Sequence, residues 1–358
     1  MRIAVDANCL AWGWSGIPKH VDRIVRELAR RPDVELDLLA NSDRSFAEIE
    51  GTREAYARRR GGWVWRNTFV TPWLKRNGPD VFWAPETALP WFVPVPAVVT
   101  VHDLAPLLLP GIKPRRHHRA FDRLLRRSVR AATRVIAVSE TTAADARRLW
   151  GLPEEKLRVV PNGVDERFAP GDEAAARAAV ATRFGLDEPY VLAVGVVEPR
   201  KGLDVLVKAA RAQAWRLVLV GDVGFRGERI LADAKAAGAR HLGRVEDDEL
   251  VELYRGAIAL AAPARYEGFG LTPLEAMACG TPAVIAAGSG GLEEVSGKAT
   301  VVVADRTPTA WREGIREAQT RRGELREPGL RLASRYRWPH VAAATLEVLR
   351  EAAADPRA

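Results

Sequence analysis

The segment YEGFGLTPLEAMACGTP, residues 266–282, combines a glycine-rich loop with the start of a helix and follows a short apolar run, Ala257–Ala261. Gly268 and Gly270 allow a ligand to approach the backbone closely. Thr272 is a candidate cap for the helix that follows. A helix that starts there would point free N–H groups and a partial positive charge at the loop. The segment therefore predicts a strand–loop–helix unit whose loop suits a phosphate.

Similar apolar runs, rich in β-branched residues, recur between amphipathic stretches along the whole chain. The expected strands are Ile3–Ala7, Glu35–Ala40, Val81–Ala84, Ala97–Val101, Arg134–Val138 and Leu157–Val160 in the first half, and Tyr190–Val194, Arg216–Val220, Ala257–Ala261, Pro282–Ala286 and Thr300–Ala304 in the second. Near-continuous apolar strands that alternate with helices are typical of parallel sheets covered on both faces. The fold class is therefore expected to be α/β.

The two strand series predict two domains, as the length of 358 residues also suggests. Pro, Asn and Gly cluster at residues 161–163, and an Ala-rich helix is expected to start at Glu173. The predicted domains are residues 1–168 and 169–358, each Rossmann-like, while a last helix at about 338–354 fits either one. Two such domains facing each other would bring the carboxyl ends of both sheets to a shared cleft, where ligands of open α/β sheets bind.

Composition favours an ordinary globular protein, with 47% hydrophobic and 28% charged residues. The two cysteines, Cys9 and Cys279, are too few for a disulfide framework or a zinc cluster, which fits a reducing cytoplasm. Asp6 interrupts the first apolar run, so we expect no signal peptide there. A cytoplasmic protein, at most peripheral on the membrane, is expected.

Positive charge is concentrated in the first half of the chain. Residues 1–168 hold 28 Lys and Arg against 20 Asp and Glu, which equals the whole net charge of +8. The basic residues between 113 and 134 are Lys113, Arg115, Arg116, Arg119, Arg123, Arg126, Arg127, Arg130 and Arg134. Those from Arg119 onward follow three- and four-residue steps and would share one helix face. This stripe predicts weak, salt-sensitive contact with an anionic membrane, and a solvated helix face is the alternative.

Aromatic residues are also concentrated in this half, where seven of the eleven tryptophans lie between Trp12 and Trp91. Such rings suit sugar rings or a membrane interface. Core packing is the alternative, notably for Trp83, which lies in an expected strand. No nucleic-acid recognition motif is present, so no nucleic-acid partner is expected.

Charged residues follow three of the expected strands. Arg200 and Lys201 come where a helix would begin, which is unfavourable for cations unless an anion binds there, although a solvated basic pair is the alternative. Glu267 lies beside the two glycines and has no obvious packing role, whereas Glu275 also fits a capping box with Thr272. His102 follows Ala97–Val101 at a strand end, where a structural histidine is the usual case and a histidine that changes protonation near neutral pH is the alternative.

Motifs for bound metals and cofactors are missing from the sequence. HExxH, CxxC, Walker A and GxGxxG are all absent, and the acidic run at residues 246–249 suits a helix start better than a metal site. We therefore expect no metal and no other cofactor.

In this order, these loops resemble glycosyltransferase family 4, whose members have the GT-B fold of two Rossmann-like domains facing across a cleft. The resemblance covers nearly the whole chain. It rests on Gly13–Pro18, Val101–Leu104, Val135–Glu140, Val160–Asp165, Glu198–Gly202, Leu242–Val245 and Glu267–Pro282, the last with two glutamates separated by seven residues.

The resemblance implies that the second domain holds a nucleotide-diphosphate sugar. Glu267 would contact the donor sugar, Glu275 the ribose, and Arg200 and Lys201 the diphosphate. The remaining implied positions are Gly268, Phe269, Gly270, Leu271 and Thr272 for sugar and phosphate, Val245 for the base, Gly16 for the diphosphate and His102 beside the reacting sugar.

The expected function is retaining transfer of a hexosyl group, mannosyl being one case, from the nucleotide sugar to a glycan, lipid-linked or small-molecule acceptor. Two cations and a helix terminus would stabilise the leaving diphosphate without a metal. The alternatives are another GT-B reaction, by a phosphorylase or a sugar-nucleotide epimerase, and a non-catalytic nucleotide-sugar-binding protein.

Overall fold

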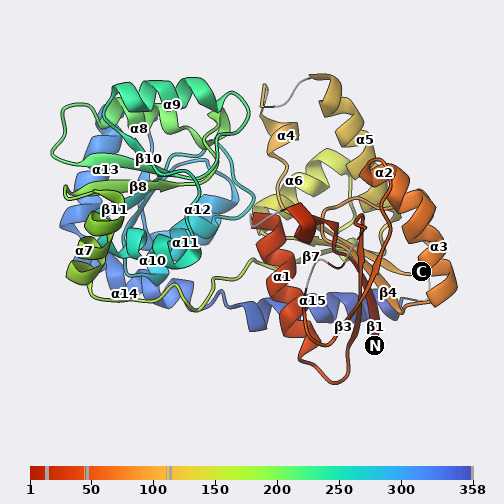
Figure 1. The fold of residues 1–358 in the computed structure, drawn as a ribbon. Coiled ribbons are helices and arrows are strands. Elements are labelled where there is room, and N and C mark those ends of the chain that lie inside the picture. The colour runs from red at the N-terminus through yellow and green to blue at the C-terminus, as the bar shows by residue number, and fades with distance from the viewer. Residues whose placement is uncertain (13–15, 44, 46–47, 110, 113–114, 356–358) are drawn as a thin grey trace. The chain divides into compact units, whose positions relative to one another are not determined.

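The computed structural model describes residues 1–12, 16–43, 45, 48–109, 111–112 and 115–355, without the side chains of 12, 115–121 and 298. The chain forms two compact units, each built on one parallel sheet (Figure 1). The first comprises Met1–Leu107, Pro114–Gly163 and Trp338–Ala358, and the second comprises Leu108–Lys113 and Val164–Arg337. None of the described helices combines the length and apolarity that a membrane crossing needs.

The first unit has a seven-stranded sheet in the order β3-β2-β1-β4-β5-β6-β7. Its strands are β1 (Arg2–Asp6), β2 (Glu35–Ala40), β3 (Thr52–Tyr56), β4 (Val81–Ala84), β5 (Ala97–Val101), β6 (Arg134–Ala137) and β7 (Leu157–Val159). All neighbours pair in parallel, so the carboxyl ends of the strands share one edge. The residues that follow the central strands β1, β4 and β5 therefore come together there.

Helices cover this sheet, and the last helix of the chain is one of them. They are α1 (Gly16–Ala29), α2 (Gly62–Trp65), α3 (Thr71–Asn77), α4 (Ala105–Leu108), α5 (Arg115–Ala131), α6 (Glu140–Trp150) and α15 (Trp338–Ala353), with short turns η1 (Asn8–Trp12), η2 (Arg66–Val70) and η3 (Glu154–Lys156). In Figure 1, α15 in blue lies beside α1 in red. Val341, Leu346 and Leu349 join the core of the first sheet, so burial of this apolar face holds α15 there.

The second unit has a six-stranded parallel sheet in the order β10-β9-β8-β11-β12-β13. Its strands are β8 (Tyr190–Val194), β9 (Arg216–Val220), β10 (Arg240–His241), β11 (Ala259–Ala262), β12 (Ala283–Ala286) and β13 (Val301–Val303). Its helices are α7 (Glu173–Phe184), α8 (Leu203–Ala209), α9 (Gly227–Ala236), α10 (Asp247–Gly256), α11 (Leu271–Ala278), α12 (Gly291–Ser296), α13 (Pro308–Thr320) and α14 (Arg322–Ala333), with short turns η4 (Pro199–Lys201) and η5 (Gly297–Ala299).

The two parallel sheets confirm the predicted α/β class, and every expected strand is present within two residues of its expected ends. Two strands, β3 and β10, were not predicted. Both lie at a sheet edge, where a strand has a neighbour on one side only and its side chains need not be apolar on both faces. The sequence of β3, Thr-Arg-Glu-Ala-Tyr, therefore lacks the apolar run that reveals a central strand.

Helix starts follow local capping chemistry, with one correction. Asp172 accepts hydrogen bonds from the N–H groups of Ala174 and Ala175 and so begins α7. The acidic run opens α10 through a capping box between Glu246 and Glu249, as expected. The predicted cap at Thr272 is wrong, because α11 begins two residues earlier, with Gly270 at the cap position.

Candidate functional site

The loops at the carboxyl edge of the second sheet are joined by main-chain hydrogen bonds. The N–H groups that donate across loops are those of Gly195 to Val220 O, Gly221 to Gly243 O, Arg265 to Arg200 O and Glu267 to Ser289 O, each at 2.7–3.0 Å. These bonds connect the ends of β8, β9, β10, β11 and β12. The side chains on these loops are therefore held in fixed relative positions.

Glu267 lies at the centre of this edge and pairs with both predicted cations. Its Oε1 is 2.6 Å from Lys201 Nζ, and its Oε2 accepts a 2.8 Å hydrogen bond from Arg200 Nη1. Arg200 also donates to the Tyr266 carbonyl and to Glu198. The side chains of Glu267, Arg200 and Lys201 are each 16–20% exposed, so the cluster is largely desolvated yet open to a ligand.

The charge of this cluster favours an ionised Glu267. Burial by itself would raise the pKa of Glu267, but Lys201 and then Arg200 outweigh it and hold the pKa below its ordinary value. Glu267 and Glu198 together balance the charges of Lys201 and Arg200. A bound diphosphate would take these two cations as charge-assisted hydrogen-bond donors beside the carboxylates.

Glycine is required at two positions of these loops. Gly202 has a φ of +65°, and a Cβ there would lie 2.2 Å from the Pro263 carbonyl oxygen. Gly270 has a φ of +130°, and a Cβ there would lie 3.0 Å from Leu292 Cα. Both loops pack too closely for a side chain, which fixes the distance between the cations and the start of α11.

The start of α11 carries the other predicted donor-site residues. Gly268, Phe269 and Gly270 are buried, and Leu271 and Thr272 form the first turn of the helix, where the N–H groups lack helical acceptors. The Phe269 ring packs edge-to-face on Tyr336, with the ring centroids 5.6 Å apart.

Glu275 lies one turn further along α11 and is half-buried. Its Oε2 accepts a 2.8 Å hydrogen bond from the hydroxyl of Tyr254. Burial and then Glu275 raise the pKa of Tyr254, so this tyrosine stays a hydrogen-bond donor. No local sequence pattern singles out Tyr254, because it occupies an ordinary apolar position of α10.

Val245 is half-buried and precedes α10. Its loop is fixed to the neighbouring one, because His241 Nε2 bonds the Gly221 carbonyl at 2.7 Å and Gly221 donates to Gly243. The structure therefore places Val245 at the same sheet edge as Glu267.

His102 lies at the carboxyl edge of the first sheet, directly after β5. Its Nε2 lies 2.9 Å from the Pro85 carbonyl, which can only accept, so Nε2 carries the hydrogen. Burial lowers the pKa of His102 to about 4, so the ring is neutral near pH 7 and Nδ1 is an acceptor. The adjacent Asp103 accepts from the N–H of Ala105 at the start of α4.

Gly16 begins α1 and is exposed. A Cβ at this position would meet no atom within 4 Å, so packing inside the described chain does not require glycine there. Gly13, Trp14 and Ser15 of the same loop lie outside the described residues.

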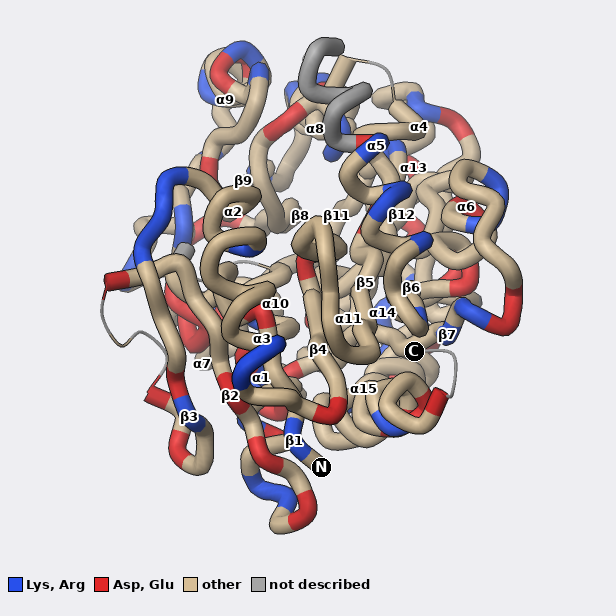
Figure 2. Tube along the Cα trace, turned by 90° about the vertical axis from the view of Figure 1, so that its right-hand side faces the viewer, with Lys and Arg blue, Asp and Glu red and all other residues tan. Residues whose placement is uncertain are grey.

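The basic stripe is only partly a free helix face. Lys113 and the side chains of Arg115, Arg116 and Arg119 lie outside the described residues, and α5 ends before Arg134. Arg134 belongs to β6 and pairs with Asp355 and Glu351, so the prediction that it shares the helix face is wrong. Arg126 pairs with Asp122, while Arg123 and Arg130 are exposed. The tube of α5 carries several blue Lys and Arg segments (Figure 2).

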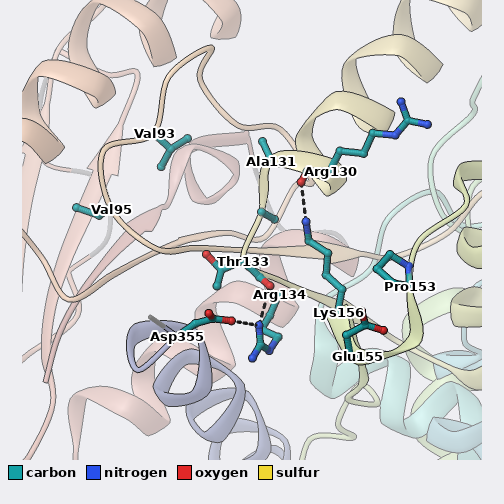
Figure 3. Close-up of a pocket in the computed structure, with 11 residues that line it drawn as sticks. Val93, Val95, Arg130, Ala131, Thr133, Arg134, Pro153, Glu155, Lys156 and Asp355 are labelled. Atoms are coloured by element: carbon teal, nitrogen blue, oxygen red, sulfur yellow. Dashed lines mark hydrogen bonds and ion pairs between the residues drawn. The ribbon is translucent and has the colours of Figure 1, made fainter. Parts of the chain in front are cut away.

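A cavity of about 370 Å³ opens at the opposite, amino edge of the first sheet (Figure 3). Lys156 Nζ donates to the Arg130 carbonyl there, and Arg134 pairs with Asp355. Two of its cations are thus already bonded within the chain. No predicted site residue lines this cavity.

Comparison with known proteins matches both units. Residues 14–168 match the family model described as Glycosyltransferase Family 4, and residues 177–328 match that of Glycosyl transferases group 1. The D-inositol 3-phosphate glycosyltransferase of Xylanimonas cellulosilytica is 36% identical over 284 residues, which are 72% of this chain and 67% of that protein. The chain belongs to glycosyltransferase family 4.

Other relatives and solved structures agree with this assignment. The D-inositol 3-phosphate glycosyltransferase of Acidothermus cellulolyticus is 34% identical over 300 residues, 74% of this chain and 63% of that protein. The family 4 chain thus spans about two thirds of the length of these relatives.

Two solved structures share the fold over 98% of this family 4 chain. The sucrose-phosphate synthase of Thermosynechococcus elongatus has a TM-score of 0.80 at 20% identity, with 98% of that chain covered. The Anabaena protein HepE, in complex with UDP-glucose, has a TM-score of 0.80 at 18% identity, with all of that chain covered. The protein is a glycosyltransferase of GT-B fold, as predicted.

Proposed function

We propose that this glycosyltransferase moves a hexosyl group from a nucleotide-diphosphate sugar to an acceptor hydroxyl with retention of configuration. The observation that carries the proposal is the pairing of Glu267 with both Lys201 and Arg200 beside the start of α11. The UDP and UDP-glucose complexes of the structural neighbour HepE support a nucleotide sugar as the donor.

In this proposal, Lys201 and Arg200 bind the diphosphate, and Glu267 and the N–H groups around residues 268–272 bind the sugar. When the anomeric C–O bond breaks, the electron pair goes to the leaving diphosphate. The two cations and the N-terminal end of α11 stabilise that growing charge. The acceptor oxygen bonds the anomeric carbon on the same face, and a leaving diphosphate oxygen takes its proton.

Glu275 would bind the ribose hydroxyls in an orientation fixed by Tyr254, and the backbone near Val245 would bind the base. Gly16 would allow the diphosphate close approach. A neutral His102 suits an orienting role, because its Nδ1 can accept a hydrogen bond from a sugar hydroxyl while Nε2 stays bonded to Pro85. No metal ligand is needed in this scheme, and metal independence stays a prediction.

The decisive experiment is a screen of UDP, GDP and ADP sugars for hydrolysis and transfer. Release of nucleoside diphosphate that does not depend on inorganic phosphate, and that is lost in Lys201→Ala, supports the proposal. Phosphate-dependent release of a sugar phosphate would instead indicate a phosphorylase, and binding without turnover of any donor would indicate a non-catalytic protein. Glycan, lipid-linked and small-molecule acceptors are then compared with the donor that is found.

We also propose that the enzyme is cytoplasmic and contacts an anionic membrane surface through its first unit. Trp63, Trp91 and Phe92 are 58–67% exposed there. Trp91 N–H donates to Asn67 Oδ1, and Asn67 Nδ2 donates to the Trp63 carbonyl, so the two aromatic segments are linked.

Arg127 of α5 covers the Trp91 ring, with its guanidinium carbon 4.3 Å from the ring centroid. Exposed aromatic rings beside Arg side chains suit the headgroup region of a bilayer. The exposed Arg123 and Arg130 lie on the same helix and would add attraction to anionic lipid.

A further inference from the structure

Glu86 occupies a fixed position at the carboxyl edge of the first sheet, directly after β4. Both of its neighbours are anchored to the adjacent strand end. The Pro85 carbonyl accepts from His102 Nε2 at 2.9 Å, and the Thr87 hydroxyl donates to the Thr100 carbonyl. The backbone of Glu86 is therefore held in place next to His102.

The backbone at Thr87 is strained. Its φ is +65°, a region that β-branched residues rarely adopt. Such a conformation persists only where the surroundings impose it, and here the bonds on either side of Glu86 do so. The strain shows that the fold holds this turn in one conformation.

One guanidinium serves two carboxylates beside this turn. Arg66 Nε donates to Asp6 Oδ2 at 2.7 Å, whereas its Nη2 reaches Glu86 Oε2 only at 3.3 Å. Asp6 is fully buried, and the Glu86 side chain is 12% exposed. Within the described part of the chain, no donor bonds Glu86 Oε1, which is also not sealed from solvent.

We propose that Glu86 accepts, through Oε1, a hydrogen bond from a hydroxyl group of a neutral, polyhydroxylated acceptor. This inference rests on the proposed function, because it assigns acceptor binding to the first unit of a glycosyltransferase. Asp6 and Arg66 act as positioning residues that orient the Glu86 carboxylate.

The charge of the cluster selects the ligand class. With Glu86 ionised, two carboxylates and one guanidinium leave a net negative charge, which repels a phosphate and attracts a hydroxyl hydrogen. The acceptor part that lies here is therefore a sugar or cyclitol hydroxyl and not a phosphate group.

The cluster also makes binding depend on pH. Burial, and then Asp6, raise the pKa of Glu86 to about 7, although Arg66 opposes the shift. Glu86 also affects Cys9 of η1. Burial and then Glu86 raise the pKa of the Cys9 thiol, so this thiol stays protonated. An ionised Glu86 is the better acceptor, so affinity for the hydroxyl rises with pH through 7.

The test is saturation-transfer NMR of the full chain with myo-inositol and methyl α-D-glucopyranoside as neutral probes, and D-inositol 3-phosphate as the anionic probe. We expect at least one neutral probe to bind at pH 8, to bind about tenfold more weakly at pH 6, and to lose most of its binding in Glu86→Gln. The matched control is Glu154→Gln, an exposed carboxylate of η3 in the same unit, which should bind as the wild type does.

The proposal is overturned if neither neutral probe binds at pH 8, if Glu86→Gln binds them equally well, or if the phosphorylated probe binds more tightly than both. Should Glu86→Gln fail to fold, the side-chain carboxyl ¹³C shift of Glu86 in the wild type decides, since it must move when a bound neutral probe is added. UDP and GDP binding is measured in parallel. If neither nucleotide binds, the proposed function is contradicted, whereas the binding of the neutral probes still decides the proposal for Glu86.

Discussion

At the carboxyl edge of the second sheet, Glu267 faces two cations, Lys201 and Arg200. At the same edge of the first sheet, Glu86 and Asp6 share the single cation Arg66. The pKa of Glu267 is consequently held below its ordinary value, while that of Glu86 is raised to about 7. Two sheets of similar topology thus place a carboxylate in opposite electrostatic surroundings at equivalent edges, where we propose donor binding at the second sheet and acceptor hydroxyl binding at the first.

The largest expected effect is the loss of activity when Lys201 or Glu267, the charged residues at the carboxyl edge of the second sheet, is replaced. Lys201→Ala and Glu267→Ala should each lower kcat/KM for the nucleotide sugar by about 100-fold or more, because each removes a charged partner of the transition state. Steady-state kinetics measures this loss, and circular dichroism checks that the fold is intact. The matched control is Lys208→Ala at the far end of α8. Near-normal turnover in both variants would falsify the donor-site assignment.

The pH dependence of stability should have opposite signs at the two edges. Because the pKa of Glu86 is raised from 4.5 to about 7, its ionisation destabilises the folded chain progressively over that window, and fully above it. Glu86→Gln should remove this loss, on the order of 3 kcal/mol, and so become more stable relative to wild type at pH 8 than at pH 5. Urea unfolding at both pH values measures the difference.

For Glu267, the lowered pKa stabilises the fold above the ordinary carboxyl pKa, and this stabilisation is lost as the pH falls through the folded value. Glu267→Gln should therefore be less stable than wild type at pH 7, with a gap that closes in acid. If both Gln variants changed stability in the same direction with pH, the contrast between the two edges would be wrong.

The outer surface of the first unit should bind anionic vesicles more strongly than neutral ones. Changing Arg123 and Arg130 to Gln together should weaken binding by roughly 30-fold at low salt, since each cation near an anionic surface contributes about 1 kcal/mol. Co-sedimentation at low and high salt measures it, with Lys235→Gln of the second unit as control. Equal binding by the double variant would show that these side chains are only solvated.

The smallest expected effect is that of metal removal. In the proposed function, Lys201, Arg200 and the start of α11 supply the positive charge for the leaving diphosphate, so chelation by EDTA should change kcat/KM by less than about twofold. A strict requirement for a divalent ion, restored only when the ion is added back, would contradict this expectation.

Much of the fold was predictable because buried parallel strands leave a strong local signal. Val81–Ala84, Ala97–Val101 and Tyr190–Val194 were predicted to the residue, since both faces of each strand are buried. The edge strands β3 and β10 were missed because edge positions need no such run. The final helix fitted either half by sequence, and contact with α1 decides its place in the first unit.

The candidate site divides in the same way. Gly268, Gly270, Glu267 and the Arg200–Lys201 pair could be singled out because loops after parallel strands carry function and their residue types are unusual there. Tyr254, Ser289 and Arg306 gave no local signal. Arg306, for example, donates to the carbonyls of Pro263 and Ala264 and so supports the Glu267 loop from the loop after β13, 39 positions away from Glu267 in sequence.

The sequence by itself determined the class of the fold and the family and singled out the loops proposed to bind the donor, because each depends on short-range pattern and residue type. Only the tertiary structure decided which charges meet. Lys201 and Arg200 pair with Glu267 because β8 and β11 are neighbours in the second sheet. Asp6 and Glu86 share the guanidinium of Arg66 because β1 and β4 are neighbours in the first sheet. Both strand pairs join segments that are 60 to 80 residues apart in sequence. The electrostatic potential of each edge is set by distances across the sheet, and no local pattern in the chain records those distances.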